Sequence, residues 1–119
     1  MRINGGSIEL LFDYMAMGQG FSVSVPRSDD APYDRILDNG ESLYKVQIKS
    51  RRASSSSVIV GLRRFSSGYT EGDFDILAVY IENNDSWYFY PFEQKRKSFR
   101  INLKNEPLNN WDIFKPSAK

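Results

Sequence analysis

Carboxylates, amides, lysines and hydroxyls carry the chemistry open to this chain, because its 119 residues include no cysteine and no histidine. Thiolate zinc sites, thiol nucleophiles and Ser-His-Asp catalysis are therefore excluded. One group of suitable residues stands out: Asp34, Gln47 and Lys49, with Glu9 farther upstream. Two carboxylates, an amide oxygen and an ammonium group are the parts of a site that holds a divalent metal ion and acts on a phosphodiester.

A predicted β-hairpin brings the first three of these residues together. The Asn-Gly pair at residues 39–40 favours a tight turn between two predicted strands, over 33–37 and 43–50. Successive residues of a strand point to opposite faces, so the second strand places Gln47 and Lys49 on one polar face. The first strand then carries its carboxylate back beside that face.

The same hairpin offers oxygen ligands for a hard divalent cation. Asp34 and the side-chain oxygen of Gln47 are two candidate ligands, and the backbone carbonyl of Ile48 is a third. Such an ion would polarise a phosphate and lower the pKa of a bound water. Lys49 would orient that water or offset charge on the phosphate oxygens. Glu9 would hold the metal through water or help position the attacking water.

The remaining patterns predict an α+β fold with one mixed sheet. A helix is expected from a Ser7 cap to residues 18–20, with Glu9 and Asp13 on its more polar, solvated face. Its apolar face is formed by residues at helical spacing, Ile8, Leu11, Phe12 and Met15. Further strands are expected at residues 21–25, 58–65, 76–81, 87–90 and 99–103, and a short C-terminal helix at 107–114. We therefore expect one domain over residues 1–119, with a central mixed β-sheet flanked by an N-terminal helix and a short C-terminal helix.

This arrangement resembles the PD-(D/E)XK nucleases, the restriction-endonuclease-like superfamily. Their core has an N-terminal helix with Glu, a first hairpin strand with Asp and a second with (Glu/Asp/Gln)-x-Lys, and here Glu9, Asp34, Gln47 and Lys49 match. Gln in place of the second acid is similar to the group I intron homing endonuclease branch. So are three further segments, at residues 23–26, 72–75 and 87–91. The resemblance implies a metal-dependent DNA endonuclease that uses Mg²⁺, with Mn²⁺ as a possible substitute.

The net charge of +1 conceals blocks of opposite sign along the chain. Residues 44–66 carry six basic and no acidic side chains, and residues 94–104 carry five basic and no acidic ones. Basic side chains that gather on one surface attract phosphates. The predicted DNA-binding residues come from these two blocks: Lys45, Arg51, Arg52, Arg63, Arg64, Lys95, Arg96, Lys97 and Arg100.

Three functions remain open on the sequence. The first is a homing- or restriction-like endonuclease acting on double-stranded DNA as a homodimer or homotetramer, because cutting both strands usually requires two active sites. The second is a Holliday junction resolvase-type nuclease acting on branched DNA. The third is a catalytically inactive nucleic-acid-binding module on the same fold. The lack of cysteine and of an apolar segment long enough to span a bilayer favours a cytoplasmic protein rather than a membrane protein.

Overall fold

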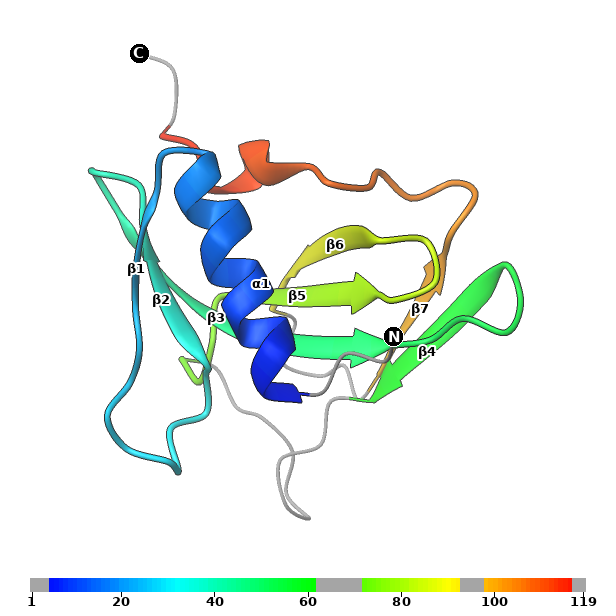
Figure 1. The fold of residues 1–119 in the computed structure, drawn as a ribbon, viewed down its shortest axis with the longest axis horizontal. Coiled ribbons are helices and arrows are strands. Elements are labelled where there is room, and N and C mark those ends of the chain that lie inside the picture. Colours follow the sequence, from blue (N-terminus) through cyan, green and yellow to red (C-terminus); the bar gives the residue numbers. More distant parts are fainter. Residues whose placement is uncertain (1–4, 62–71, 93–97, 117–119) are drawn as a thin grey trace.

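A computed structural model describes residues 5–61, 72–92 and 98–116 as a helix followed by strands and a short final helix (Figure 1). Helix α1 (Gly5–Gly18) leads into β1 (Ser22–Ser24), β2 (Arg35–Asp38) and β3 (Leu43–Arg51). The later elements are β4 (Ser57–Gly61), β5 (Ile76–Ile81), β6 (Ser86–Pro91), β7 (Ser98–Asn102) and the 3-10 helix η1 (Trp111–Phe114). The predicted α+β class is confirmed.

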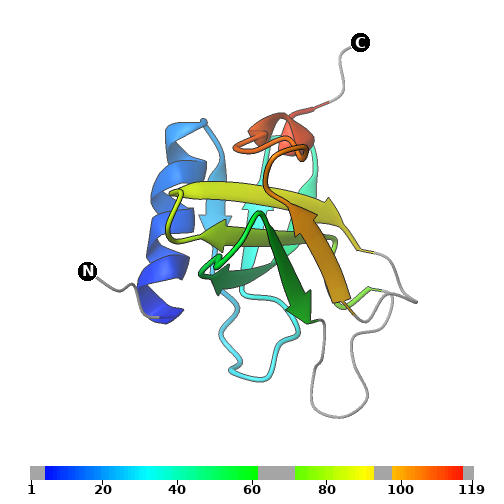
Figure 2. The ribbon, with the colours of Figure 1, turned by 90° about the vertical axis from the view of Figure 1, so that its right-hand side faces the viewer.

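The central sheet is mixed and has five strands in the order β1-β2-β3-β5-β6. Strand β2 is antiparallel to both β1 and β3, β3 and β5 are parallel, and β6 returns antiparallel to β5. Strands β4 and β7 form a separate antiparallel ribbon (Figure 2). The expectation of one sheet was therefore wrong, because β4 and β7 pair with each other instead of extending the central sheet.

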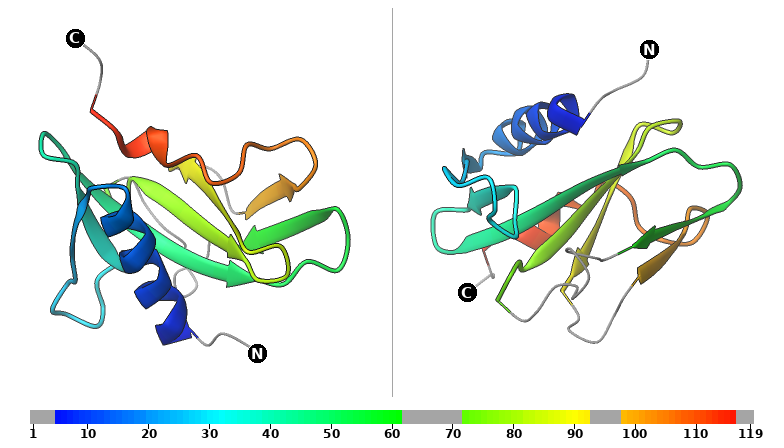
Figure 3. Two further views of the ribbon diagram at one scale, coloured as in Figure 1. Left: turned by 45° about the horizontal axis from the view of Figure 1, so that its top comes forward. Right: turned by 90° about the horizontal axis from the view of Figure 1, so that it is seen from below.

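The two faces of the central sheet are covered by different elements (Figure 3). On one face, α1 and η1 pack through Ile8, Phe12 and Phe114 against the inward side chains of β3, β5 and β6. On the other face, the β4–β7 ribbon packs through Val58, Val60 and Ile101. Because both faces are covered, all six residues of β5 are buried, as its continuous apolar run predicted.

The hairpin between β2 and β3 forms where the sequence places it. The Asn39 N–H donates to the Ser42 carbonyl at 3.1 Å, and Gly40 takes the left-handed conformation that the turn requires (φ 94°). Strand β2 begins at Arg35 rather than at residue 33. This difference leaves Asp34 at the point where the chain enters the sheet.

Other element boundaries differ in smaller ways from the prediction. Helix α1 begins at Gly5, so Ser7 lies in its first turn instead of capping it. The described part of the strand predicted over 58–65 ends at Gly61, and residues 62–65 lie outside the described part of the chain. Within residues 5–61, 72–92 and 98–116, no helix combines the length and apolar character needed to cross a lipid bilayer.

Candidate active site

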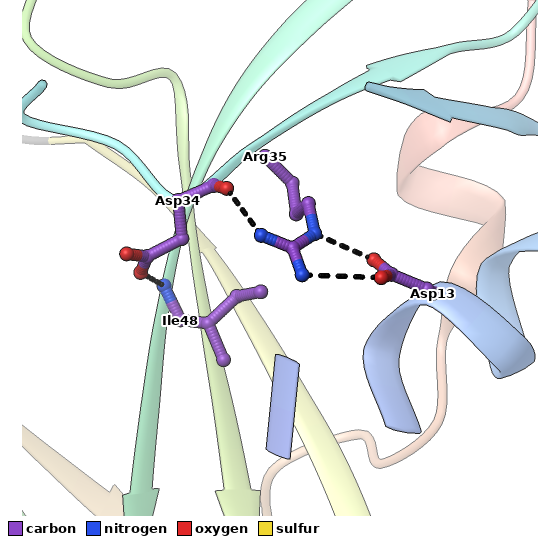
Figure 4. Close-up of polar contacts among 4 residues, drawn as sticks. All are labelled: Asp13, Asp34, Arg35 and Ile48. Carbon is purple, nitrogen blue, oxygen red and sulfur yellow. Dashed lines mark hydrogen bonds and ion pairs between the residues drawn. The ribbon is translucent and has the colours of Figure 1, made fainter. Parts of the chain in front are cut away.

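Asp34 is held at the edge where β2 separates from β3 (Figure 4). Its backbone N–H donates to the Val46 carbonyl at 2.8 Å. Its side-chain Oδ2 accepts a hydrogen bond from the Ile48 N–H, also at 2.8 Å. Two bonds from one strand thus fix both the backbone and the carboxylate of Asp34.

Gln47 and Lys49 lie on the face of β3 opposite its buried residues. The register pairs Arg35 with Val46, so the next position places Asp34 across from Gln47. Both Gln47 and Lys49 are half-buried. Burial and the nearby charge of Arg51 lower the pKa of Lys49, while the negative charge of Asp34 acts the other way. The Lys49 ammonium therefore lies within electrostatic reach of the Asp34 carboxylate, as the hairpin predicted.

The backbone carbonyl of Ile48 lies beside the same carboxylate. In an antiparallel ladder, the N–H and C=O of one residue point toward the same neighbouring strand. The Ile48 N–H is bonded to Asp34, so its carbonyl points toward the β2 side of β3 as well. Strand β2 begins at Arg35, which pairs with Val46. The Ile48 carbonyl therefore lies beyond the first residue of β2. The structure thus places the Ile48 carbonyl on the same side of β3 as the Asp34 carboxylate.

Glu9 reaches the site from the first half of α1. Burial raises the pKa of its carboxyl, and the negative charge of Asp34 and a hydrogen bond with that side chain raise it further, whereas Arg35 opposes the shift. Glu9 and Asp34 line one open cleft of about 190 Å³, and Gln47 and Lys49 do not line it. The cleft's other lining residues come from the adjoining loop and β2: Val25, Pro26, Ser28, Asp29, Ala31, Tyr33 and Arg35.

Asp13 and Arg35 form a buried ion pair that sequence reasoning missed. The Arg35 guanidinium donates to the two Asp13 oxygens at 2.7 and 3.1 Å and to the Asp34 carbonyl at 2.8 Å. The two side chains are 17% and 8% exposed, so the prediction of a solvated Asp13 was wrong. The sequence showed only that Asp13 lies four residues after Glu9 and shares its helix face.

This ion pair fixes α1 on the sheet. Burial works against the charge of Arg35, but its bonds to Asp13 and the charges of Asp13, Glu9 and Asp34 raise the Arg35 pKa. One guanidinium therefore contacts both the helix that carries Glu9 and the backbone of Asp34. We infer that the pair sets the separation of the two cleft carboxylates.

The predicted DNA-binding residues fall into three groups. Arg51, Arg52 and Arg100 line a second cleft. Lys45 has structural partners instead, since its Nζ donates to the Gly72 carbonyl at 2.8 Å and lies 5.8 Å from the centre of the Tyr33 ring. The others lie outside the described residues: Arg63, Arg64, Lys95, Arg96 and Lys97.

The donor set of the first cleft suits a hard divalent cation. Two of the predicted oxygen donors, the carboxylates of Glu9 and Asp34, line this cleft, whereas Gln47 and Ile48 lie on the neighbouring strand β3 and do not line it. Burial is the main cause of the raised Glu9 pKa and the charge of Asp34 adds to it, so a cation between the two carboxylates would relieve their repulsion. Among the described residues, no cluster of three or more acidic, His or Cys side chains could hold a metal. A divalent cation held between Glu9 and Asp34 would therefore also need neutral oxygen ligands.

Comparison with known protein families assigns the chain to a family. Residues 13–112 match the family described as PD-(D/E)XK endonuclease. The chain belongs to this family. The matched range contains Asp34, Gln47 and Lys49, whereas Glu9 precedes it. PD-(D/E)XK nucleases generally use divalent metal ions such as Mg²⁺. No curated protein sequence matches the chain.

Two solved structures share the fold of this PD-(D/E)XK chain. The bacterial homing endonuclease I-Ssp6803I superposes with a TM-score of 0.73 at 21% identity, over 92% of this chain and 89% of that one. The Holliday junction resolvase Hjc from Archaeoglobus fulgidus superposes with a TM-score of 0.59 at 14% identity, over 96% and 98%. The predicted restriction-endonuclease-like fold is confirmed.

Proposed function

We propose that this protein is a metal-dependent DNA endonuclease that hydrolyses phosphodiester bonds. The observation that carries the proposal is the contact between Asp34 Oδ2 and the Ile48 N–H at 2.8 Å. It holds a carboxylate beside Lys49 and Glu9, in a chain that belongs to an endonuclease family.

Each residue of the site has a distinct role in this proposal. Asp34, Gln47 and the Ile48 carbonyl hold Mg²⁺ or Mn²⁺, and Glu9 supports the same ion. The ion supplies Lewis acidity toward a phosphate oxygen and makes an attacking water more acidic. Lys49 either orients that water or donates to the phosphate oxygen on which charge develops. A preorganised donor of this kind contributes about 3–4 kcal/mol of transition-state stabilisation.

Duplex DNA is the substrate that we favour. The likeness to a homing endonuclease has the higher TM-score of the two and extends over nearly all of both chains. A second candidate activity, cleavage of branched DNA, is supported by the likeness to a Holliday junction resolvase over almost the full length of each chain. The two activities share the chemistry of the site and differ in the DNA that fits it.

We further propose that the protein works as a homodimer or homotetramer, because cutting both strands needs two sites. Helix α1 offers a surface for a second copy. Leu10, Tyr14 and Met17 are spaced along one face of the helix and are 66%, 72% and 57% exposed. This outer stripe carries no charge, so the same stripe of a second copy could pack against it without like-charge repulsion.

The proposal is tested by offering three DNA substrates in parallel. A linear duplex, a single strand and a four-way junction are incubated with the protein in Mg²⁺, Mn²⁺ or EDTA. We expect metal-dependent cutting of the duplex, abolished by Asp34→Ala and by Lys49→Ala, with folding and DNA binding retained in both. Cutting of the junction alone would favour the resolvase activity. No cutting of any substrate with either metal would favour an inactive binding module.

A further inference from the structure

A second cleft, of about 380 Å³, opens beside the end of β3 and is strongly basic. Three arginines line it, Arg51, Arg52 and Arg100, and no acidic residue does. Its remaining lining residues belong to the serine-rich loop and the start of β4: Ser54, Ser55, Ser57, Val58 and Ile59. We call this site the arginine cleft.

Two segments that are distant in the sequence, residues 51–59 and strand β7, build the arginine cleft. Arg51 ends β3, Arg52 follows it, and Arg100 comes from β7, where it pairs with Ile59 of β4. In Figure 1 the end of β3 meets the β4–β7 ribbon at this point. The pairing of two ribbon strands thus brings Arg100 to the two arginines of β3 and its loop.

The guanidinium groups of the cleft keep donors for a ligand. Arg51 uses one N–H on the Ser50 carbonyl at 2.8 Å and has four more. Among the described residues, no carboxylate lies within ion-pair distance of any of the three arginines. Several guanidinium forks with serine hydroxyls and no competing acid suit a tetrahedral oxyanion such as phosphate.

The arginine cleft adjoins the catalytic strand. Arg51 lies two residues after Lys49 on β3, a separation of about 7 Å along a strand. Its charge contributes to the lowered pKa of Lys49, so the two cations lie within electrostatic reach. Phosphates of one DNA strand are spaced about 3.4 Å along the helix axis. A strand cut at Lys49 would therefore bring a phosphate about two to four nucleotides away to the cleft.

We propose that the arginine cleft binds a backbone phosphate of the strand being cut, about two to four nucleotides from the scissile phosphate. The inference rests on the proposed function for the identity of the polymer. A contact of this kind adds affinity and fixes the register of the DNA without reading its bases.

Binding measured in EDTA tests the proposal without requiring cleavage. Fluorescence anisotropy with a duplex is followed across salt concentrations for the wild type, Arg52→Ala, Arg100→Ala and the double variant. Lys115→Ala is the matched control, because it removes one positive charge from an exposed ion pair on Asp112. We expect the slope of log K against log salt to fall by about one for each cleft arginine removed, and no change in the control. Arg52 and Arg100 are exposed, and thermal unfolding checks that both variants fold.

Neutral methylphosphonate linkages, placed one at a time along the duplex, locate the phosphate. A neutral linkage at one position, two to four nucleotides from the cut, should weaken DNA binding by the wild type about tenfold. The same linkage should leave binding by the double variant unchanged. Equal losses in both proteins at every position would overturn the proposal. So would binding that depends only on a terminal 5′-phosphate, tested with phosphorylated and unphosphorylated ends. If no DNA is cut but the position-specific loss appears, the cleft assignment stands and the endonuclease proposal fails.

Discussion

The Ile48 peptide N–H donates a hydrogen bond of 2.8 Å to the Asp34 carboxylate, directly before the first residue of β2. This bond occupies Oδ2 and leaves Oδ1 for another partner. It also places the Asp34 carboxylate beside β3, where Lys49 lies within electrostatic reach of it. A single hairpin thus carries Asp34, Gln47 and Lys49, three of the predicted site residues, and α1 carries the fourth, Glu9.

Replacing Glu9 with Gln should stabilise the metal-free protein while weakening its function. The folded-state pKa of Glu9 lies above 4.5, so its ionisation costs stability as the pH rises through the folded pKa. At neutral pH, Glu9→Gln removes that cost, on the order of 0.5 kcal/mol because the pair is partly solvated. We expect a rise in melting temperature of about 1–3 °C, absent below pH 4. A lower melting temperature at neutral pH would contradict the raised Glu9 pKa, to which burial and the charge of Asp34 both contribute.

Lys49 should set the alkaline limb of the pH–rate profile. Because its pKa is lowered from 10.5, Lys49 loses its proton at a lower pH than a free lysine. If the charged form acts, cleavage falls as the pH rises through that lowered pKa. Lys49→Arg keeps a positive charge at every accessible pH, so its residual cleavage should lack this decline. An unchanged alkaline limb in the Arg variant would exclude Lys49 as the titrating group.

Breaking the Asp13–Arg35 pair should destabilise the fold strongly. Asp13→Ala leaves a buried guanidinium without its carboxylate, and we expect a loss of about 2–4 kcal/mol in urea unfolding. The matched control is Asp112→Ala, since Asp112 and Lys115 form an exposed pair at 2.8 Å and its loss should cost about 0.5 kcal/mol or less. Equal effects of the two variants would show that the buried pair does not fasten α1 to the sheet.

The outer face of α1 should govern assembly. Tyr14 is 72% exposed, so Tyr14→Glu leaves the core intact while placing a charge in the centre of the stripe. Sedimentation should then report a monomer where the wild type forms a dimer or tetramer. Serine at the same position is the matched neutral control and should weaken assembly less. If the wild type is monomeric at micromolar concentration, the outer face of α1 does not mediate assembly.

Local sequence signals predicted the core of the candidate site. Asp34 lies directly before β2 and Gln47 lies on β3, and an Asn-Gly turn joins these two strands, so the turn alone sets which residues face each other. The continuous apolar run of β5 likewise predicted a strand covered on both faces. The turn depends on neighbouring residues, and the buried strand depends on local composition. Both can therefore be predicted without knowing which element packs against them.

Features that depend on long-range pairing could not be predicted in this way. The ribbon of β4 and β7 joins segments about 40 residues apart, and no local pattern specifies that partnership. Helix α1 is apolar on its inner and outer faces, so its periodicity could not show that Asp13 turns inward to Arg35. For the same reason, the meeting of Arg100 with Arg51 at one cleft became visible only in the structure.

The central claim is that the Asp34 carboxylate holds the metal ion needed for DNA cleavage. The cleavage rate of Asp34→Asn tests this claim most directly. Asparagine has nearly the same shape and can still accept the Ile48 N–H through its amide oxygen, so the hairpin should stay intact while the negative charge is lost. In Mg²⁺, we predict that the wild type cuts duplex DNA and that the variant is at least 100-fold slower, with unchanged folding and DNA binding. Cutting by Asp34→Asn at the wild-type rate would contradict the account.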